Sequence, residues 1–317
     1  MRDVYAAVAG WIAERTPYAI ATLIDVRNAA PAPRGSSMAV TAGGTIAGDI
    51  GAGCYEGEIV EATIATARDG RARVLELDLT SDDIISGGSG CGGFLEVVTW
   101  RPAAGFGEVA AAIAAGRRDV SFRIAYERNG RAANFEATIP ARRRLIVVGG
   151  TVLAQELASI ATRLDFGTLV VDPRPAFATA ERLTAVEEIV VGWPQDVLPA
   201  LLTATSPLVV ISHDPKLDLP ALRAGLQSDA PYIGLLGSRR AQNGRRQMLA
   251  AEGFDQRALA RIHGPAGLDL GGVTMAETAV SILAEIVADA RGRAGGSLLQ
   301  REGAIHNTER SAHAAGR

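Results

Sequence analysis

The sequence predicts an α/β protein with two parts, an N-terminal α/β domain and a C-terminal Rossmann-like domain built on a doubly wound parallel sheet. In the second half, short continuous apolar runs alternate with helical segments, which is the pattern of buried parallel strands and their crossover helices. The first half instead mixes strand-like stretches with Gly-rich loops. The length of 317 residues agrees with two domains of roughly 150 residues each.

Composition narrows the class of protein. The 32 basic residues nearly balance the 35 acidic ones, giving a net charge of −3, so a nucleic-acid partner is not expected. We find no apolar run near about 18 residues and no leader-like start, so we expect no membrane segment and a cytoplasmic location. The chain has 2 cysteines, which cannot form a disulfide framework and favour a reducing compartment.

The N-terminal domain is expected over residues 1–138. Val4 and Val8 share one face of a first helix with Trp11 and Ile12, because apolar residues three and four apart lie together on a helix. The helices are expected at residues 4–15, 55–69 and 107–116. The strands are expected at 19–26, 38–40, 72–79 and 94–100, with two more between 120 and 137.

The Rossmann-like domain is expected over residues 139–290. Its strands should be the apolar runs at 145–148, 169–171, 189–191, 208–211 and 232–236, and a last amphipathic helix should span about 275–290. Residues 139–144 resemble a linker. The tail at 291–317 is polar and rich in Gly and Ala, so we expect it to be disordered.

The segment from Leu145 to Asp172 has the order of a dinucleotide fingerprint: strand, tight turn, helix, strand and acidic residue. Gly149 allows the turn, and Asp172 stands where a ribose-binding acid is expected. Thr151 replaces the second glycine, which normally lets the backbone approach a pyrophosphate. Gly149, Gly150, Thr151 and Asp172 are therefore candidate cofactor contacts, and a modified pocket without nucleotide remains the alternative.

Both cysteines lie in Gly-rich loops. Such loops offer backbone N–H groups to anions, and a thiol at a helix start becomes more acidic. The alternative is that each cysteine is a small apolar residue filling a turn. Because the chain has no cysteine outside these two loops, we favour a functional role, without expecting zinc, since the chain has no CxxC motif. The candidate contacts are Gly51, Gly53, Cys54, Gly90, Cys91 and Gly92.

Two further candidate segments follow predicted strands of the second domain. His213 and Lys216 come directly after residues 208–211, at the strand end where α/β sheets bind ligands. The alternative is that Asp214 caps the next helix and that Lys216 is solvated. Ser238 is an expected N-cap. The positive charge of Arg239 after it is unfavourable next to the positive end of the helix dipole, and a bound anion or an acidic neighbour would offset that cost.

A last segment, from Arg261 to Gly272, places His263 in a loop rich in Gly and Pro. The imidazole could serve as a ligand or a base. The alternative is that it hydrogen-bonds the backbone and shapes the turn. We find no Ser/His/Asp triad and no obvious carboxylate pair.

Taken in order, several segments resemble the XdhC/CoxI family, accessory proteins of molybdenum hydroxylases such as xanthine dehydrogenase, aldehyde oxidoreductase and carbon monoxide dehydrogenase. The resemblance spans about residues 17–290. The segments are GAGCYEGEIVEA and GCGGFLEVV in the first half, and LIVVGGTVLAQEL, VVDPR, SHDPKLD, YIGLLGSRR and RIHGPAGLDLGGVTMAETAVSILAEI in the second.

The resemblance implies that the protein binds molybdenum cofactor, as molybdopterin or its cytosine dinucleotide, and protects it. It further implies help with sulfuration by a cysteine desulfurase, insertion into the apoenzyme of a molybdenum hydroxylase, and a homodimer. Cys54 and Cys91 would be the matching cysteines, and we expect them to face an interdomain cleft and meet the metal end of the cofactor. The alternatives are an NAD(P)-dependent oxidoreductase with His263 as proton donor and an interaction scaffold with empty pockets.

Overall fold

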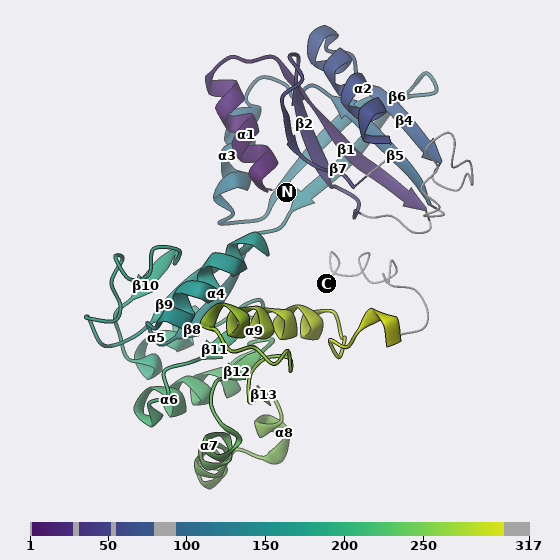
Figure 1. Cartoon of the computed structure of the whole chain (residues 1–317). Helices are drawn as coiled ribbons and strands as arrows, with labels where there is room; N and C mark the ends of the chain where they lie inside the picture. Colours follow the sequence, from purple (N-terminus) through teal and green to yellow (C-terminus); the bar gives the residue numbers. More distant parts are fainter. Residues whose placement is uncertain (1, 28–31, 52–54, 79–92, 301–317) are drawn as a thin grey trace. The chain divides into compact units, whose positions relative to one another are not determined.

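The computed structural model describes residues 2–27, 32–51, 55–78 and 93–300. They fall into two units, one ending at Ala141 and the other beginning at Arg142. Each unit has its own main sheet and its own hydrophobic core (Figure 1).

The first unit contains an antiparallel five-stranded sheet in the order β3-β2-β1-β5-β4 and a separate two-stranded ribbon, β6-β7. Its elements, in chain order, are α1 (Arg2–Ala13), β1 (Tyr18–Arg27), β2 (Ser37–Thr41), β3 (Ile46–Gly48), α2 (Glu56–Asp69), β4 (Arg73–Asp78), β5 (Phe94–Trp100), α3 (Phe106–Ala115), β6 (Val120–Arg128) and β7 (Arg131–Ile139).

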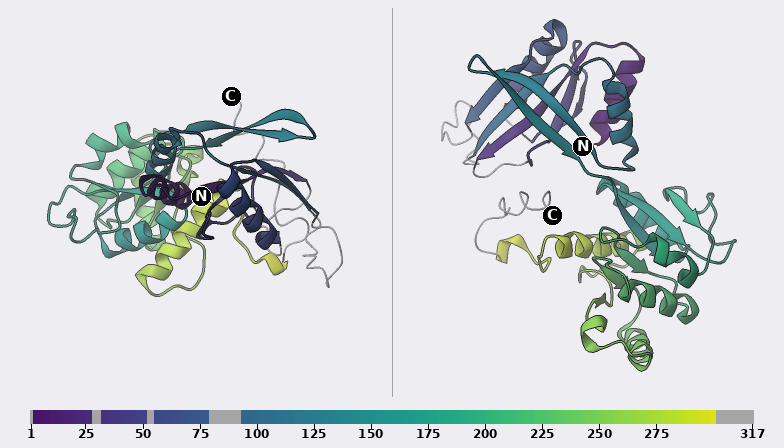
Figure 2. Two further views of the ribbon diagram at one scale, coloured as in Figure 1. Left: turned by 90° about the horizontal axis from the view of Figure 1, so that it is seen from above. Right: turned by 180° about the vertical axis from the view of Figure 1, so that it is seen from behind.

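Both faces of this five-stranded sheet are covered by other elements of the unit. Because successive residues of a strand point to opposite sides, each strand contributes buried residues to both faces. Ile20 and Val98 pack on one side beneath α1, α3 and the β6–β7 ribbon. Leu23 and Val97 pack on the other side against Ile59 of α2. Figure 2 shows the ribbon, in teal, as a long hairpin lying across the sheet.

The second unit has a six-stranded parallel sheet in the order β10-β9-β8-β11-β12-β13. Its elements are β8 (Arg143–Val148), α4 (Val152–Arg163), β9 (Phe166–Val171), β10 (Glu188–Val190), α5 (Pro194–Leu201), β11 (Leu208–Val210), α6 (Pro215–Leu226), β12 (Ile233–Leu235), α7 (Arg239–Ala251), α8 (Gln256–Leu259), β13 (Ile262–His263) and α9 (Met275–Ala290). The strand order reverses between β8 and β11, so the predicted Rossmann-like, doubly wound fold is confirmed.

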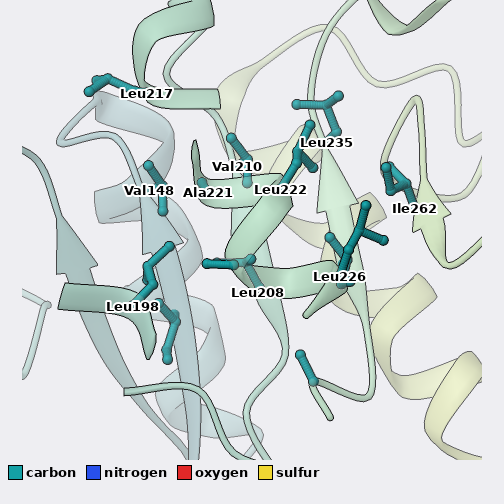
Figure 3. Packing of buried hydrophobic residues seen from close by; sticks show 14 of the residues in the cluster. Val148, Leu198, Leu208, Val210, Leu217, Ala221, Leu222, Leu226, Leu235 and Ile262 are labelled. Carbon is teal, nitrogen blue, oxygen red and sulfur yellow. The ribbon is translucent and has the colours of Figure 1, made fainter. Parts of the chain in front are cut away.

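Helices pack on both faces of the parallel sheet. Val148, Val210 and Leu235 of three strands contact Leu222 of α6 and Leu198 of α5 in one cluster (Figure 3). On the opposite face, α4 and α9 cover the alternate strand residues. Burial on both faces explains why these strands are continuous apolar runs in the sequence.

The structure corrects the connection between the two halves. Ile139 ends β7, and Arg143 begins β8, so the connecting segment is only Pro140–Arg142 rather than residues 139–144. Within the expected tail, Leu298–Gln300 form a 3-10 turn, and residues 301–317 lie outside the described part. Among the residues described, no helix is long and apolar enough to cross a bilayer.

Candidate functional site

The turns that follow β8, β9, β11 and β12 meet at the carboxyl edge of the parallel sheet, where α/β folds bind ligands. Gly149, in the first of these turns, has a φ of +117°. A Cβ at Gly149 would lie 3.0 Å from Cα of Ser212, the residue that follows Ile211 at the end of the β11 segment. Glycine is therefore required both by the backbone conformation and by the close approach of these two turns.

The next glycine is covered by the chain itself. A Cβ at Gly150 would lie 2.6 Å from the carbonyl oxygen of Phe177, in the loop after β9. A dinucleotide-binding domain uses this backbone for close approach of a pyrophosphate. In this protein the backbone of Phe177 makes that close approach.

Asp172 is fully buried, and its carboxylate is occupied by internal donors. Gly150 donates its N–H to Oδ2 at 2.8 Å. Arg174 donates its backbone N–H at 3.0 Å and its Nε at 2.8 Å to Oδ1, and its Nη2 at 2.6 Å to Oδ2. Burial acts to raise the pKa of Asp172, but the hydrogen bonds from Arg174 and Gly150 outweigh it and lower that pKa.

These contacts correct the expected role of Asp172. The residue stands at the end of β9 as the sequence predicts, but it presents no surface to a ribose. Its carboxylate ties the turn after β8 to the turn after β9. The signal for this role was the Arg two positions further along the chain, which can reach back to the acid.

Thr151 is the N-cap residue of α4, but its side chain makes no capping hydrogen bond. Its Oγ1 is buried and has no hydrogen-bond partner among the described residues. Its backbone carbonyl accepts a hydrogen bond from Ala154 N at 3.0 Å, so the residue begins the helix through its backbone and not through its hydroxyl.

A buried ion pair contacts the turn after β11 and holds it in place. Arg245 of α7 contacts Asp218 of α6 at 2.6 Å, and the same carboxylate accepts a hydrogen bond from Ser212 Oγ at 2.6 Å. Arg245 also donates to the carbonyl oxygen of His213 at 3.3 Å. His213 has a φ of +59°, a left-handed conformation that these surrounding contacts maintain.

The structure brings His213 next to the turn after β12. Its Nδ1 lies 3.9 Å from the position that a Cβ on Gly237 would take. Ser238 caps α7 by accepting from Ala241 N at 3.3 Å, as predicted. Asp214 caps α6 by accepting from Lys216 N at 2.9 Å, which is the alternative that the sequence left open.

The cations of these two turns are exposed. Lys216, Arg239 and Arg240 are all on the surface, and none of them makes an ion pair with another described residue. The acidic neighbour that could have offset Arg239 and Arg240 is therefore not found within the described part of the chain. This half of the carboxyl edge keeps positive charge that is free to meet an anion.

His263 contacts a carboxylate rather than the backbone. Its Nδ1 lies 3.2 Å from Oε1 of Glu285 on α9, and its ring lies 4.4 Å from that of Tyr232. Tyr232 Oη and Gly267 N donate to Oε2 of Glu285 at 2.6 and 2.7 Å. Burial acts to raise the pKa of Glu285, but these hydrogen bonds together lower it. Sequence reasoning missed Glu285, whose only signal is a carboxylate next to the apolar face of α9.

The candidate cysteines and three of their glycines lie outside the described residues: Gly53, Cys54, Gly90, Cys91 and Gly92. Gly51 is described, with a φ of +67°. The residues that flank the two segments are neighbours. Tyr55 donates its hydroxyl to the carbonyl oxygen of Asp78 at 2.7 Å, and Asp78 pairs with Phe94 across β4 and β5. Both cysteine-containing segments therefore begin or end at one end of the first unit's sheet.

Two family models match the chain. The model described as the XdhC and CoxI family matches residues 11–78, and the model described as the XdhC Rossmann domain matches residues 145–286. A solved structure described as a xanthine dehydrogenase from Bacillus halodurans superposes with a TM-score of 0.75 at 22% identity, covering 94% of this chain and 98% of the other. That likeness shows the fold.

Curated relatives agree with the family models. A protein from Bacillus subtilis, named as a probable subunit of xanthine dehydrogenase, is 23% identical over 84% of this chain and 92% of its own length. The molybdenum cofactor insertion chaperone PaoD from Escherichia coli is 23% identical over 84% of this chain and 81% of its own. The protein YqeB from Escherichia coli is 24% identical over 90% of this chain. The match spans only 46% of the length of YqeB, so this chain corresponds to about half of that relative. With both halves matched, the chain belongs to the XdhC and CoxI family.

Proposed function

We propose that the protein is a chaperone for molybdenum cofactor that protects the cofactor, assists its sulfuration and inserts it into the apoenzyme of a molybdenum hydroxylase. PaoD, the relative named as a molybdenum cofactor insertion chaperone, is similar over 84% of the chain, so the likeness extends over both units. The cofactor is the cargo, and a cysteine desulfurase is the source of its sulfur. The chaperone works as a homodimer in the cytoplasm in this proposal.

The metal end of the cargo is assigned to Cys54 and Cys91. A thiolate is a soft ligand, which suits molybdenum held by a dithiolene better than an oxygen or nitrogen donor does. The observation that carries this assignment is the hydrogen bond from Tyr55 to Asp78, because it joins the residues next to both cysteine-containing segments. Because the segments that carry the two thiols are attached to the neighbouring residues Tyr55 and Asp78, we propose that both thiols bind one ligand.

The anionic end of the cargo is assigned to the turns after β11 and β12. His213 and Ser238 lie in adjacent turns, and Lys216 and Arg239 provide exposed positive charge there. A pterin phosphate needs such donors and no general base. Exposure of these groups also suits a protein that must release its cargo.

An NAD(P)-dependent oxidoreductase receives less support from the geometry. Its ribose acid would be Asp172, whose carboxylate is buried and bonded to Arg174 and Gly150. Its pyrophosphate would need the backbone of Gly150, against which the Phe177 carbonyl already lies.

The proposal is tested by loading the full chain with molybdenum cofactor and removing free cofactor by gel filtration. Molybdenum per chain and activation of an apo-hydroxylase are then measured for the wild type, for Cys54→Ser, for Cys91→Ser and for the double variant. We expect the double variant to lose retention and activation while its thermal unfolding midpoint stays unchanged. Full retention and full activation in the folded double variant would refute the cysteine roles.

A further inference from the structure

We propose that the outward face of α9 binds the same face of a second copy of this chain, with the two helices packed antiparallel. The inference rests on the proposed function for the expectation of a homodimer, to which no surface has been assigned so far. In such a dimer both copies contribute the same residues, so the face must be complementary to itself in shape and in charge.

The helix α9 is apolar on two opposite sides. Its inward side packs into the core of the second unit through Ala279, Ile282, Leu283 and Ile286. Its outward side carries a second apolar stripe, formed by Ala276, Val280, Ala284 and Val287. Residues spaced three or four apart lie on one side of a helix, so the four outward residues form one continuous stripe. A helix that is apolar all round is normally buried all round.

The outward stripe is exposed. Val280 is 45% and Val287 38% exposed, although β-branched residues are not favoured on a solvated helix surface. The segment before the helix widens the apolar surface, because Leu268 donates its backbone N–H to the Ser281 carbonyl oxygen at 3.2 Å and so runs beside α9. In the same segment Val273 is 90% exposed. Contiguous exposed apolar side chains of this kind mark a protein interface.

The charges along α9 favour a second copy in the antiparallel orientation. Residues 264–290 contain acidic side chains but no Lys or Arg, and Arg291 and Arg293 follow directly. Neither arginine makes an ion pair with another described residue. Antiparallel packing places these cations beside the acidic start of the other copy's helix, at Glu277, whereas parallel packing would place like charges together. Asp289, near the basic end, lies on the side of His263, 3.9 Å from its Nε2.

A two-fold axis near Ala284 makes the stripe complementary to itself. Glu277 and Arg291 lie equally far before and after Ala284 in the chain, so each would face the other across the axis. Val280 and Val287 also flank Ala284 and would pack against one another. The small side chain of Ala284 at the axis allows the two helices to approach closely.

Sedimentation equilibrium of the full chain tests the interface. We expect a dimer, and we expect Val280→Asp and Val287→Asp each to raise its dissociation constant by about tenfold or more, because the interface contains every substitution twice. Val152→Asp is the matched control, since Val152 is 61% exposed at the start of α4 and receives the same charge. A chain that stays monomeric up to about 100 μM overturns the proposal, as does an unchanged constant in both folded stripe variants.

Cysteine cross-linking tests the orientation. In the Cys54→Ser/Cys91→Ser background the introduced thiol is the only one in the chain. On oxidation, Ala284→Cys should form a disulfide between the two copies. Ala276→Cys on the same stripe should not, because its two positions would lie about 24 Å apart along the paired helices. These variants add no charge, so they remain decisive if an aspartate variant fails to fold. Equal cross-linking at both positions, or none at Ala284→Cys, would contradict the arrangement.

The cofactor-loading experiment separates this inference from the proposed function. A chain that dimerises through α9 but never retains molybdenum cofactor would refute the proposed function and leave the interface standing. A monomeric chain that retains the cofactor would overturn the interface and leave the cargo role standing. A Val280→Asp variant that stays dimeric but no longer activates the apo-hydroxylase would assign the outward face of α9 to that enzyme, and so overturn the proposal.

Discussion

The two halves of the carboxyl edge of the parallel sheet differ in what their polar groups contact. In the half formed by β8 and β9, Gly150, Asp172 and Arg174 bond to one another, and the chain covers its own glycine turn. In the half formed by β11 and β12, Lys216 and Arg239 are exposed without an ion-pair partner in the described structure. The comparison teaches that a fingerprint can be retained for packing while cationic groups in the neighbouring turns stay exposed.

The largest expected effect concerns the buried ion pair next to the turn after β11. Arg245→Met removes the partner of Asp218, whose side chain is 1% exposed. Leaving that carboxylate buried and unpaired should lower the free energy of unfolding by about 3–5 kcal/mol, measured by urea denaturation. The matched control is Arg223→Met, which breaks a half-exposed pair with Glu252 and should cost about 0–1 kcal/mol. Equal losses in the two variants would mean that the Asp218 pair does not support the His213 turn.

In the half formed by β8 and β9, one added methyl group should displace the loop that covers the glycine turn. In Gly150→Ala the new Cβ would meet the Phe177 carbonyl at 2.6 Å, so the loop after β9 must shift. We expect a loss of about 1–3 kcal/mol of stability by denaturant titration. Gly244→Ala in α7 is the control, because no heavy atom lies within 4 Å of its added Cβ, and it should gain about 0.5–1 kcal/mol. A neutral Gly150→Ala would show that the turn is not closed by Phe177.

The pH dependence of stability sharpens the same comparison. The folded pKa of Asp172 lies below its ordinary value of 3.8, so its contribution is fully present above pH 3.8 and is lost as the pH falls through the folded pKa. Unfolding free energies measured from pH 6 downward should therefore fall more steeply for the wild type below pH 3.8 than for Asp172→Asn. Parallel curves would indicate that Arg174 and Gly150 do not stabilise the ionised carboxylate.

The smallest expected effect is a gain. Thr151→Val replaces a buried hydroxyl that has no partner with a methyl group of similar size. Because an unsatisfied buried polar group is unfavourable, the variant should be more stable by about 1 kcal/mol. The difference is measured by urea denaturation, as the shift in the midpoint multiplied by the slope of the unfolding free energy against urea concentration. Thr162→Val is the control, since Thr162 donates to Ala158 O at 3.0 Å. A loss in Thr151→Val would show that its hydroxyl has a bonding role.

Much of the fold follows from sequence pattern, and less of the site does. Buried parallel strands must be apolar throughout, so β8, β9 and β11 could be located from their composition. The strand β13 could not, because Ile262–His263 is too short to show a period. The family resemblance, based on ordered motifs, is confirmed by the family models.

The site was harder to predict because a residue type does not fix its partner. Asp172 was found by its spacing, yet Arg174 determines that it bonds internally. His263 was found by its loop, yet Glu285, 22 positions further along the chain, determines its contacts. Such pairings depend on the path of the chain in space, which local spacing does not encode.

Hydrogen exchange on the full chain, with and without bound molybdenum cofactor, tests the central claim most directly. We expect the cofactor to slow exchange at the peptides containing His213–Lys216 and Ser238–Arg240, and to leave the peptide containing Gly149–Thr151 unchanged. Protection confined to Gly149–Thr151, with no change at the turns after β11 and β12, would contradict the account.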